Sequence, residues 1–169
     1  MRTLVTIAAV AALAASLVLP ASAARATFDG NACGLLGDSQ FKASGLVGSS
    51  CKELPTKSGT WGSLGTLTAF AALYRNTRIR GTHQLLLIVV KASDPSAVLA
   101  YLRQNKDTLL RTLGVAGITG RSVKGSGERW FLAGGSYGVY AGLVDSTAKK
   151  RAVVKALASI EAGVKAAVS

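Results

Sequence analysis

The sequence of 169 residues is poor in the groups on which most metal sites and active sites depend. It has one histidine, His83, and two cysteines, Cys33 and Cys51. A metal site needs several His, Cys or carboxylate ligands close together, and a dithiol redox enzyme would carry a Cys-x-x-Cys pair. We therefore predict no metal ligand, no cofactor and no catalytic residue, and we expect a protein that is not an enzyme.

Acidic residues are also few, with eight Asp and Glu against 20 Lys and Arg. No two of the eight stand close enough in sequence to share a helix face, so the paired carboxylates of a glycosidase are not indicated. The glycine-rich segment 133–138 is followed by the alternating pattern of a strand, which favours a hairpin turn over a phosphate loop. An enzyme built from residues far apart in the sequence remains an alternative.

Residues 1–23 have the pattern of a Sec-type signal peptide. Arg2 precedes an apolar run from Leu4 to Leu19, Pro20 follows, and Ala21-Ser22-Ala23 supplies small residues for a signal peptidase. The run is about 16 residues long, shorter than the roughly 20 that a membrane-spanning helix needs. We expect cleavage near Ala24, a mature chain without a transmembrane segment, and a periplasmic or extracellular location.

Export changes how the two cysteines are interpreted. In an oxidising compartment Cys33 and Cys51 most simply form one disulfide. The closed loop would stabilise the fold by about 3 kcal/mol on chain-entropy grounds. Their Cα atoms should then lie about 4.4–6.8 Å apart.

The mature residues 24–169 read as one α+β domain. The expected fold is a mostly antiparallel sheet of about five strands, with a central amphipathic helix and a C-terminal helix packed on it. In chain order we expect a short helix capped by Asp38 or Ser39, a loop over 52–63, strands over 67–74 and 82–92, a helix from Pro95 to Leu113, strands over 118–123, 128–133 and 136–144, and a final helix capped by Asp145 or Ser146.

The segment Cys33-Gly34-Leu35-Leu36, followed by a short helix and a second cysteine, resembles a group of small exported bacterial domains. These envelope domains of unknown function open with a Cys-x-Leu-Leu motif and are often lipid-anchored. The resemblance implies a cystatin-like or related α+β fold and no known enzyme activity. It supplies no functional residues, and this chain lacks the cysteine that would carry the lipid.

Two basic clusters are the remaining feature that suggests a function. Arg75, Arg78 and Arg80 crowd one predicted turn, and Lys149, Lys150 and Arg151 crowd the start of the last helix, where the macrodipole disfavours cations. They suggest contact with an anionic lipid or envelope polysaccharide; nucleic acid is less favoured, because few aromatics accompany them. A merely solubilising surface, and ligand or protein binding in an apolar cleft between sheet and helix, are the alternatives.

Overall fold

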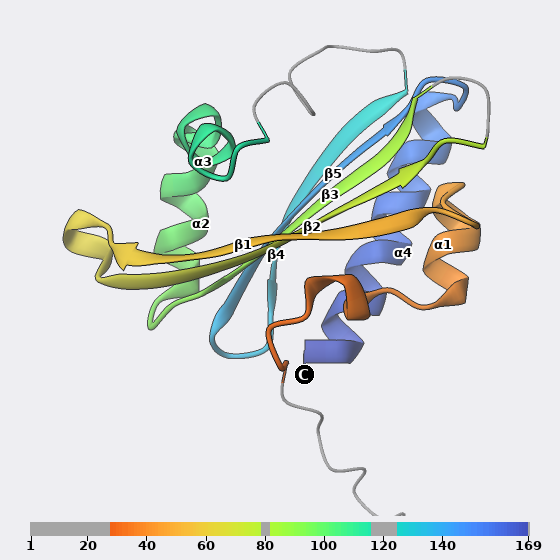
Figure 1. Cartoon of the computed structure of the whole chain (residues 1–169). Helices are drawn as coiled ribbons and strands as arrows, with labels where there is room; N and C mark the ends of the chain where they lie inside the picture. The colour runs from red at the N-terminus through yellow and green to blue at the C-terminus, as the bar shows by residue number, and fades with distance from the viewer. Residues whose placement is uncertain (1–27, 79–81, 116–124, 169) are drawn as a thin grey trace, which may run out of the picture.

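The computed structural model describes residues 28–78, 82–115 and 125–168, and it confirms an α+β fold (Figure 1). Five strands form one sheet in the order β1-β2-β3-β5-β4, and every neighbouring pair is antiparallel. The elements are the 3-10 helix η1 (Ala32–Leu35), α1 (Asp38–Ser44), β1 (Ser50–Thr60), the 3-10 helix η2 (Gly62–Leu64), β2 (Thr66–Asn76), β3 (His83–Lys91), α2 (Pro95–Gln104), α3 (Lys106–Thr112), β4 (Ser126–Ala133), β5 (Tyr137–Asp145) and α4 (Lys150–Val168).

Helices cover both faces of this sheet. On one face α4, α1 and η1 pack against Leu85, Leu87 and Val89 of β3. On the other, α2 and α3 pack against the alternate residues of the same strand, among them Leu86 and Ile88. All of these side chains are fully buried. The unbroken apolar run of β3 therefore reflects a central strand with two covered faces, as the sequence predicts.

The edge strand β1 occupies residues that the sequence analysis assigned to a loop. The predicted loop over 52–63 is wrong, because residues 50–60 form a strand that pairs with β2. The strand lies at the edge of the sheet, and most of its side chains are exposed. An exposed edge strand does not need the apolar alternation by which strands are recognised. It also tolerates Pro55, which lies where the register shifts between Leu54 and Lys57.

The predicted central helix is two helices with a break at Asn105. Asp94 caps the first, since its side chain accepts a hydrogen bond of 3.0 Å from the N–H of Ala97. At Asn105 the backbone leaves the helical region, with φ −112° and ψ 32°, and the side-chain amide donates to the carbonyl of Tyr101. This local bond competes with helix propagation. The predicted strand over 118–123 lies outside the described residues.

The predicted disulfide is confirmed. Cys33 and Cys51 are bonded, with their Cα atoms 5.9 Å apart and a sequence separation of 18. The bond ties η1 to the start of β1. The buried hydroxyl of Tyr74 on β2 supports the same turn, because it donates to the carbonyl of Ala32 at 2.9 Å.

Candidate functional site

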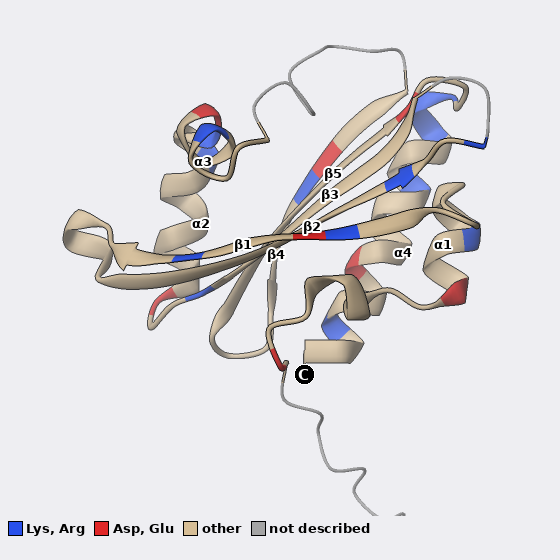
Figure 2. Ribbon diagram, in the orientation of Figure 1, with Lys and Arg blue, Asp and Glu red and all other residues tan. Residues whose placement is uncertain are grey.

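The strand register brings the two basic clusters to the same end of the sheet. Asn76 at the end of β2 pairs with His83 at the start of β3, and His83 pairs with Asp145 at the end of β5. Helix α4 begins five residues after β5, at Lys150. We call Arg75, Arg78, Lys149, Lys150 and Arg151 together the basic end. Figure 2 shows Lys and Arg gathered there, around the start of α4. Arg80 lies outside the described residues.

The five side chains of the basic end are exposed and carry no neutralising partner. In the part of the chain that the structure describes, none of them forms an ion pair. The carboxylate of Asp145 lies at this end but is largely covered, with 14% of its side chain exposed. It accepts hydrogen bonds of 3.0 Å from the N–H groups of Thr147 and Ala148. The five cations are therefore not neutralised by direct ion pairs with any residue that the structure describes.

Arg75, near the end of β2, and Arg78, just after it, lie on different sides of the sheet. Tyr74 packs with the residues that face α4, so its neighbour Arg75 projects toward the side of α2 and α3. Arg78 follows the strand, and its guanidinium Nη1 lies 3.8 Å from where a Cβ on Gly48 would stand. Gly48 belongs to the loop after α1. Arg78 thus lies on the α1–α4 side of the sheet, with Lys149, Lys150 and Arg151. Arg75 lies at the same end of the sheet but on its opposite face.

A small polar network beneath the basic end holds its loops in place. Asn76 is 4% exposed, and its amide donates at 2.9 Å to the carbonyl of Val47, in the loop after α1. Its side-chain oxygen accepts at 3.0 Å from the backbone N–H of Arg78. Because both partners are loop backbone, Asn76 determines where the chain leaves β2.

His83 is buried beside Asp145, a pairing that the sequence does not reveal. Its Nδ1 lies 3.1 Å from Oδ1 of Asp145, and the residue is 5% exposed. A His–Asp pair is a familiar part of acid–base catalysis, but an imidazole covered to this extent offers no surface to a substrate in this arrangement. Sixty-two positions separate the two residues, so only the register of β3 on β5 brings them together.

Neither Asp145 nor Ser146 caps the final helix, which corrects the prediction. Asp145 instead closes the turn at Thr147 and Ala148. The hydroxyl of Ser146 accepts a hydrogen bond of 2.8 Å from the N–H of Thr82. Both side chains tie the end of β5 to neighbouring backbone, and the helix starts later, within the basic cluster.

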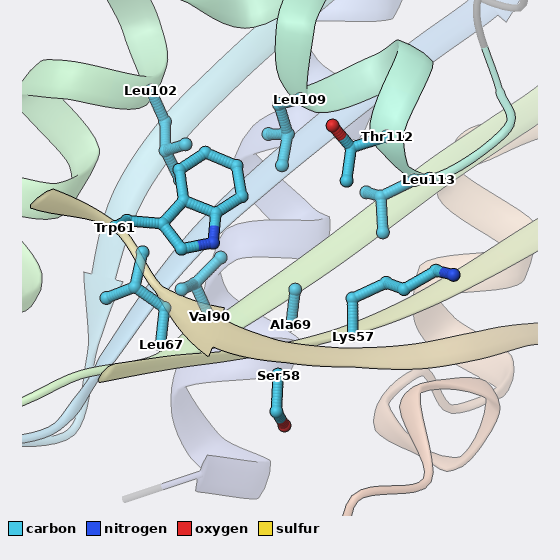
Figure 3. Close-up of a pocket in the computed structure, with 10 residues that line it drawn as sticks. All are labelled: Lys57, Ser58, Trp61, Leu67, Ala69, Val90, Leu102, Leu109, Thr112 and Leu113. Atoms are coloured by element: carbon cyan, nitrogen blue, oxygen red, sulfur yellow. The ribbon is translucent and has the colours of Figure 1, made fainter. Parts of the chain in front are cut away.

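A second candidate site is an apolar cavity between the sheet and α3 (Figure 3). Its volume is about 130 Å³. Leu67, Ala69 and Val90 form the floor, α2 and α3 form the roof, and Trp61 and Lys57 lie on opposite sides. The complete lining is Lys57, Ser58, Trp61, Leu67, Ala69, Val90, Leu102, Leu109, Thr112 and Leu113.

The cavity exists because β1 supplies little apolar volume at this place. The strand aligns Lys57 with Ala69 and Gly59 with Leu67, so these two residues face the α3 side. Gly59 has no side chain, and Lys57 is exposed. A second hollow of about 300 Å³ lies beyond Trp61, lined by η2 and Tyr101. The sequence analysis missed Trp61 and Lys57 because it treated this segment as a loop.

The described residues place further bounds on the chemistry of the chain. Residues 28–78, 82–115 and 125–168 include no group of three His, Cys, Asp or Glu side chains that could hold a metal ion. Within the same ranges, every helix is too short or too polar to cross a membrane.

Comparisons of the chain with protein-family models, with curated proteins and with solved structures found no match.

Proposed function

We propose that this chain is an exported, non-enzymatic envelope or secreted module whose basic end contacts an anionic component of the envelope. The convergence of the β2 and α4 clusters at one end of the sheet carries the proposal. Export is supported by the pattern of residues 1–23, and the Cys33–Cys51 disulfide fits an oxidising compartment.

The charge arrangement favours a surface contact over a site for a small anion. The cations are exposed and spread over the end of β2, the residues that follow it and the first turn of α4. Exposed like charges raise the local concentration of a polyanion and steer its approach. Cations at a helix N-terminus oppose the macrodipole, so an anion bound there would relieve an unfavourable interaction.

Binding to a polyanion tests this proposal. The mature protein should sediment with vesicles that contain an anionic phospholipid and not with purely zwitterionic vesicles. Binding should weaken steeply as sodium chloride screens the charges. Retention on a heparin column measures binding to an acidic polysaccharide. The two measurements together show whether the protein binds the anionic lipid, the polysaccharide or both.

A charge-matched pair of variants controls for net charge. Lys150→Glu/Arg151→Glu should weaken binding by about tenfold or more and flatten its salt dependence, since each basic residue near an anionic surface contributes about 1 kcal/mol. Arg103→Glu/Arg111→Glu changes the net charge equally at exposed positions on α2 and α3. If both double variants lose binding equally, the cations form only a general solubilising surface and the proposal is wrong.

A further inference from the structure

We infer that the cavity between the sheet and α3 is a binding site for a small apolar acid. The ligand has a hydrocarbon body about the size of one aromatic ring and a single anionic group. Its body lies over Ala69 and Val90 against Trp61, and its anionic group contacts Lys57. This site is separate from the basic end and does not depend on the function proposed above.

The volume of the cavity sets the size of the ligand. Its value of about 130 Å³ is close to the roughly 150 Å³ of apolar cavities known to stay dry and to take up benzene. An unfilled apolar cavity loses dispersion contacts on its whole lining and lowers the stability of the fold. A ring-sized hydrocarbon would restore those contacts.

The hydroxyl groups of two lining residues are engaged elsewhere, which favours an apolar ligand body. The hydroxyl of Thr112 donates at 2.9 Å to the carbonyl of Thr108 within α3. The hydroxyl of Ser58 points away from the cavity (Figure 3) and donates at 3.1 Å to the hydroxyl of Thr68. Neither hydroxyl therefore offers its proton to a ligand, and most of the residues that a ligand body would meet are apolar.

Trp61 gives the cavity an aromatic wall. Its ring stands edge-to-face with Tyr101, with the centroids 6.4 Å apart, and its backbone N–H donates to the carbonyl of Gly65 at 2.9 Å. Both contacts hold the indole across the boundary between the cavity and the outer hollow. An aromatic ligand could add offset or edge-to-face contacts with this ring.

Lys57 determines the charge of the ligand. Its aliphatic stem lines the cavity, and its ammonium group points away from Trp61, at the opposite end of the cavity (Figure 3). It forms no ion pair with any residue that the structure describes. None of the ten lining residues is acidic. A cation at one end of an otherwise apolar cavity favours a ligand with one anionic end.

Three probes of similar size and different charge test the inference on the mature protein. Phenylacetate, 2-phenylethanol and 2-phenylethylammonium are titrated while the indole N–H resonances of the two tryptophans are followed by NMR. The resonance of Trp61 should shift and saturate, and that of Trp130 on β4, which does not line the cavity, should stay nearly unchanged. Phenylacetate should bind at least about threefold more tightly than the alcohol, and the ammonium probe should bind most weakly.

Variants separate the cavity from the charge. Ala69→Leu should fill the cavity, abolish the titration of all three probes and leave the melting temperature equal or higher. Lys57→Gln should keep the binding of 2-phenylethanol and remove the preference for phenylacetate. Lys52→Gln is the matched control, because this exposed lysine of the same strand does not line the cavity.

A second filling variant guards against a folding defect in the first. Gly59→Leu enters the cavity from β1, where a Cβ would meet only Trp61, at an ordinary distance of 3.8 Å. The inference is wrong if the wild type binds no probe up to the solubility limit, if folded filling variants bind as the wild type does, or if the three probes bind equally. Lys150→Glu/Arg151→Glu should leave the titration unchanged, so a failure of the proposed function is distinguished from a failure here.

Discussion

At the scale of single residues, a few buried polar side chains hold the irregular segments against the sheet. Tyr74 is fully buried on β2, and its hydroxyl donates to the carbonyls of Ala32 and Cys33 at 2.9 and 3.1 Å. Burial, and then the nearby charge of Glu53, raise the pKa of this phenol far above its ordinary value. The hydroxyl therefore stays protonated at neutral pH and remains a donor to η1.

Removing that hydroxyl should destabilise the fold. We expect Tyr74→Phe to lower the free energy of unfolding by about 1–2 kcal/mol, because the buried carbonyl of Ala32 and the partly buried carbonyl of Cys33 lose their donor. Urea denaturation followed by circular dichroism measures the change. Tyr101→Phe is the control, because Tyr101 is 42% exposed and its change should stay within about 0.5 kcal/mol. Equal effects of the two substitutions would contradict the structural role of the Tyr74 hydroxyl.

At the scale of elements, one acidic side chain joins the last helix to the edge strand β4. Glu161 on α4 is paired with Lys165 one turn later and with Arg129 on β4. The hydrogen bond from Lys165, and next that from Arg129, lower the pKa of this carboxyl, against the opposing effect of partial burial. The same helix packs closely on β4, where a Cβ on Gly127 would stand 2.9 Å from Val153.

The lowered pKa of Glu161 predicts a specific acid sensitivity. A carboxyl whose pKa is lower in the folded state stabilises the fold above its unfolded pKa of about 4.3, and this stabilisation is lost as the pH falls through the folded value. Glu161→Gln should therefore reduce the loss of stability between about pH 5 and pH 3 by up to about 1 kcal/mol. Thermal melts across this range measure it.

Salt provides the control for this prediction. In about 1 M sodium chloride the wild type and Glu161→Gln should show more similar pH dependence, because salt screens the exposed Lys165 and Arg129 that pair with Glu161. If, at low salt, the stability of Glu161→Gln falls with acid as steeply as that of the wild type, the ion pair does not contribute to the acid sensitivity of the fold.

At the scale of the whole molecule, the disulfide, the sheet and the two helical layers form a connected unit. The Cys33–Cys51 bond attaches η1 to the edge strand β1, and η1 contributes Ala32 and Leu35 to the core beneath α4. The α2–α3 layer and its cavity lie on the opposite face of the sheet. Disruption of the disulfide should therefore loosen the α1–α4 side first.

The double variant Cys33→Ser/Cys51→Ser should lose about 3 kcal/mol of stability, as expected for a closed loop of this length. Denaturation of the wild type in the presence of a reductant should give the same value, which controls for the serine side chains. Phenylacetate should still bind at temperatures where the variant is folded. If the reduced and oxidised forms unfold at the same denaturant concentration, the disulfide does not stabilise this fold.

The parts of the fold that can be predicted from the sequence are those in which neighbouring residues alone indicate the secondary structure and its burial. The apolar run 85–90 indicates a strand covered on both faces, and Asp94-Pro95 indicates a helix start, because each depends only on neighbouring residues. With two cysteines in the chain, the disulfide pairing also follows from the sequence, provided that the protein is exported. The break at Asn105 was not predicted, because the apolar face continues across it.

Tertiary structure alone decided the edge strand and both candidate sites. Strand β1 is held by hydrogen bonds to β2 rather than by an apolar pattern of its own, and the cavity exists because Gly59 and Lys57 lie opposite Leu67 and Ala69. The basic end likewise depends on the register of β2, β3 and β5. Periodicity and cysteine content are local properties that the sequence determines by itself. Register and the volume left between layers arise from pairings between distant residues, so they appear only when the chain is folded.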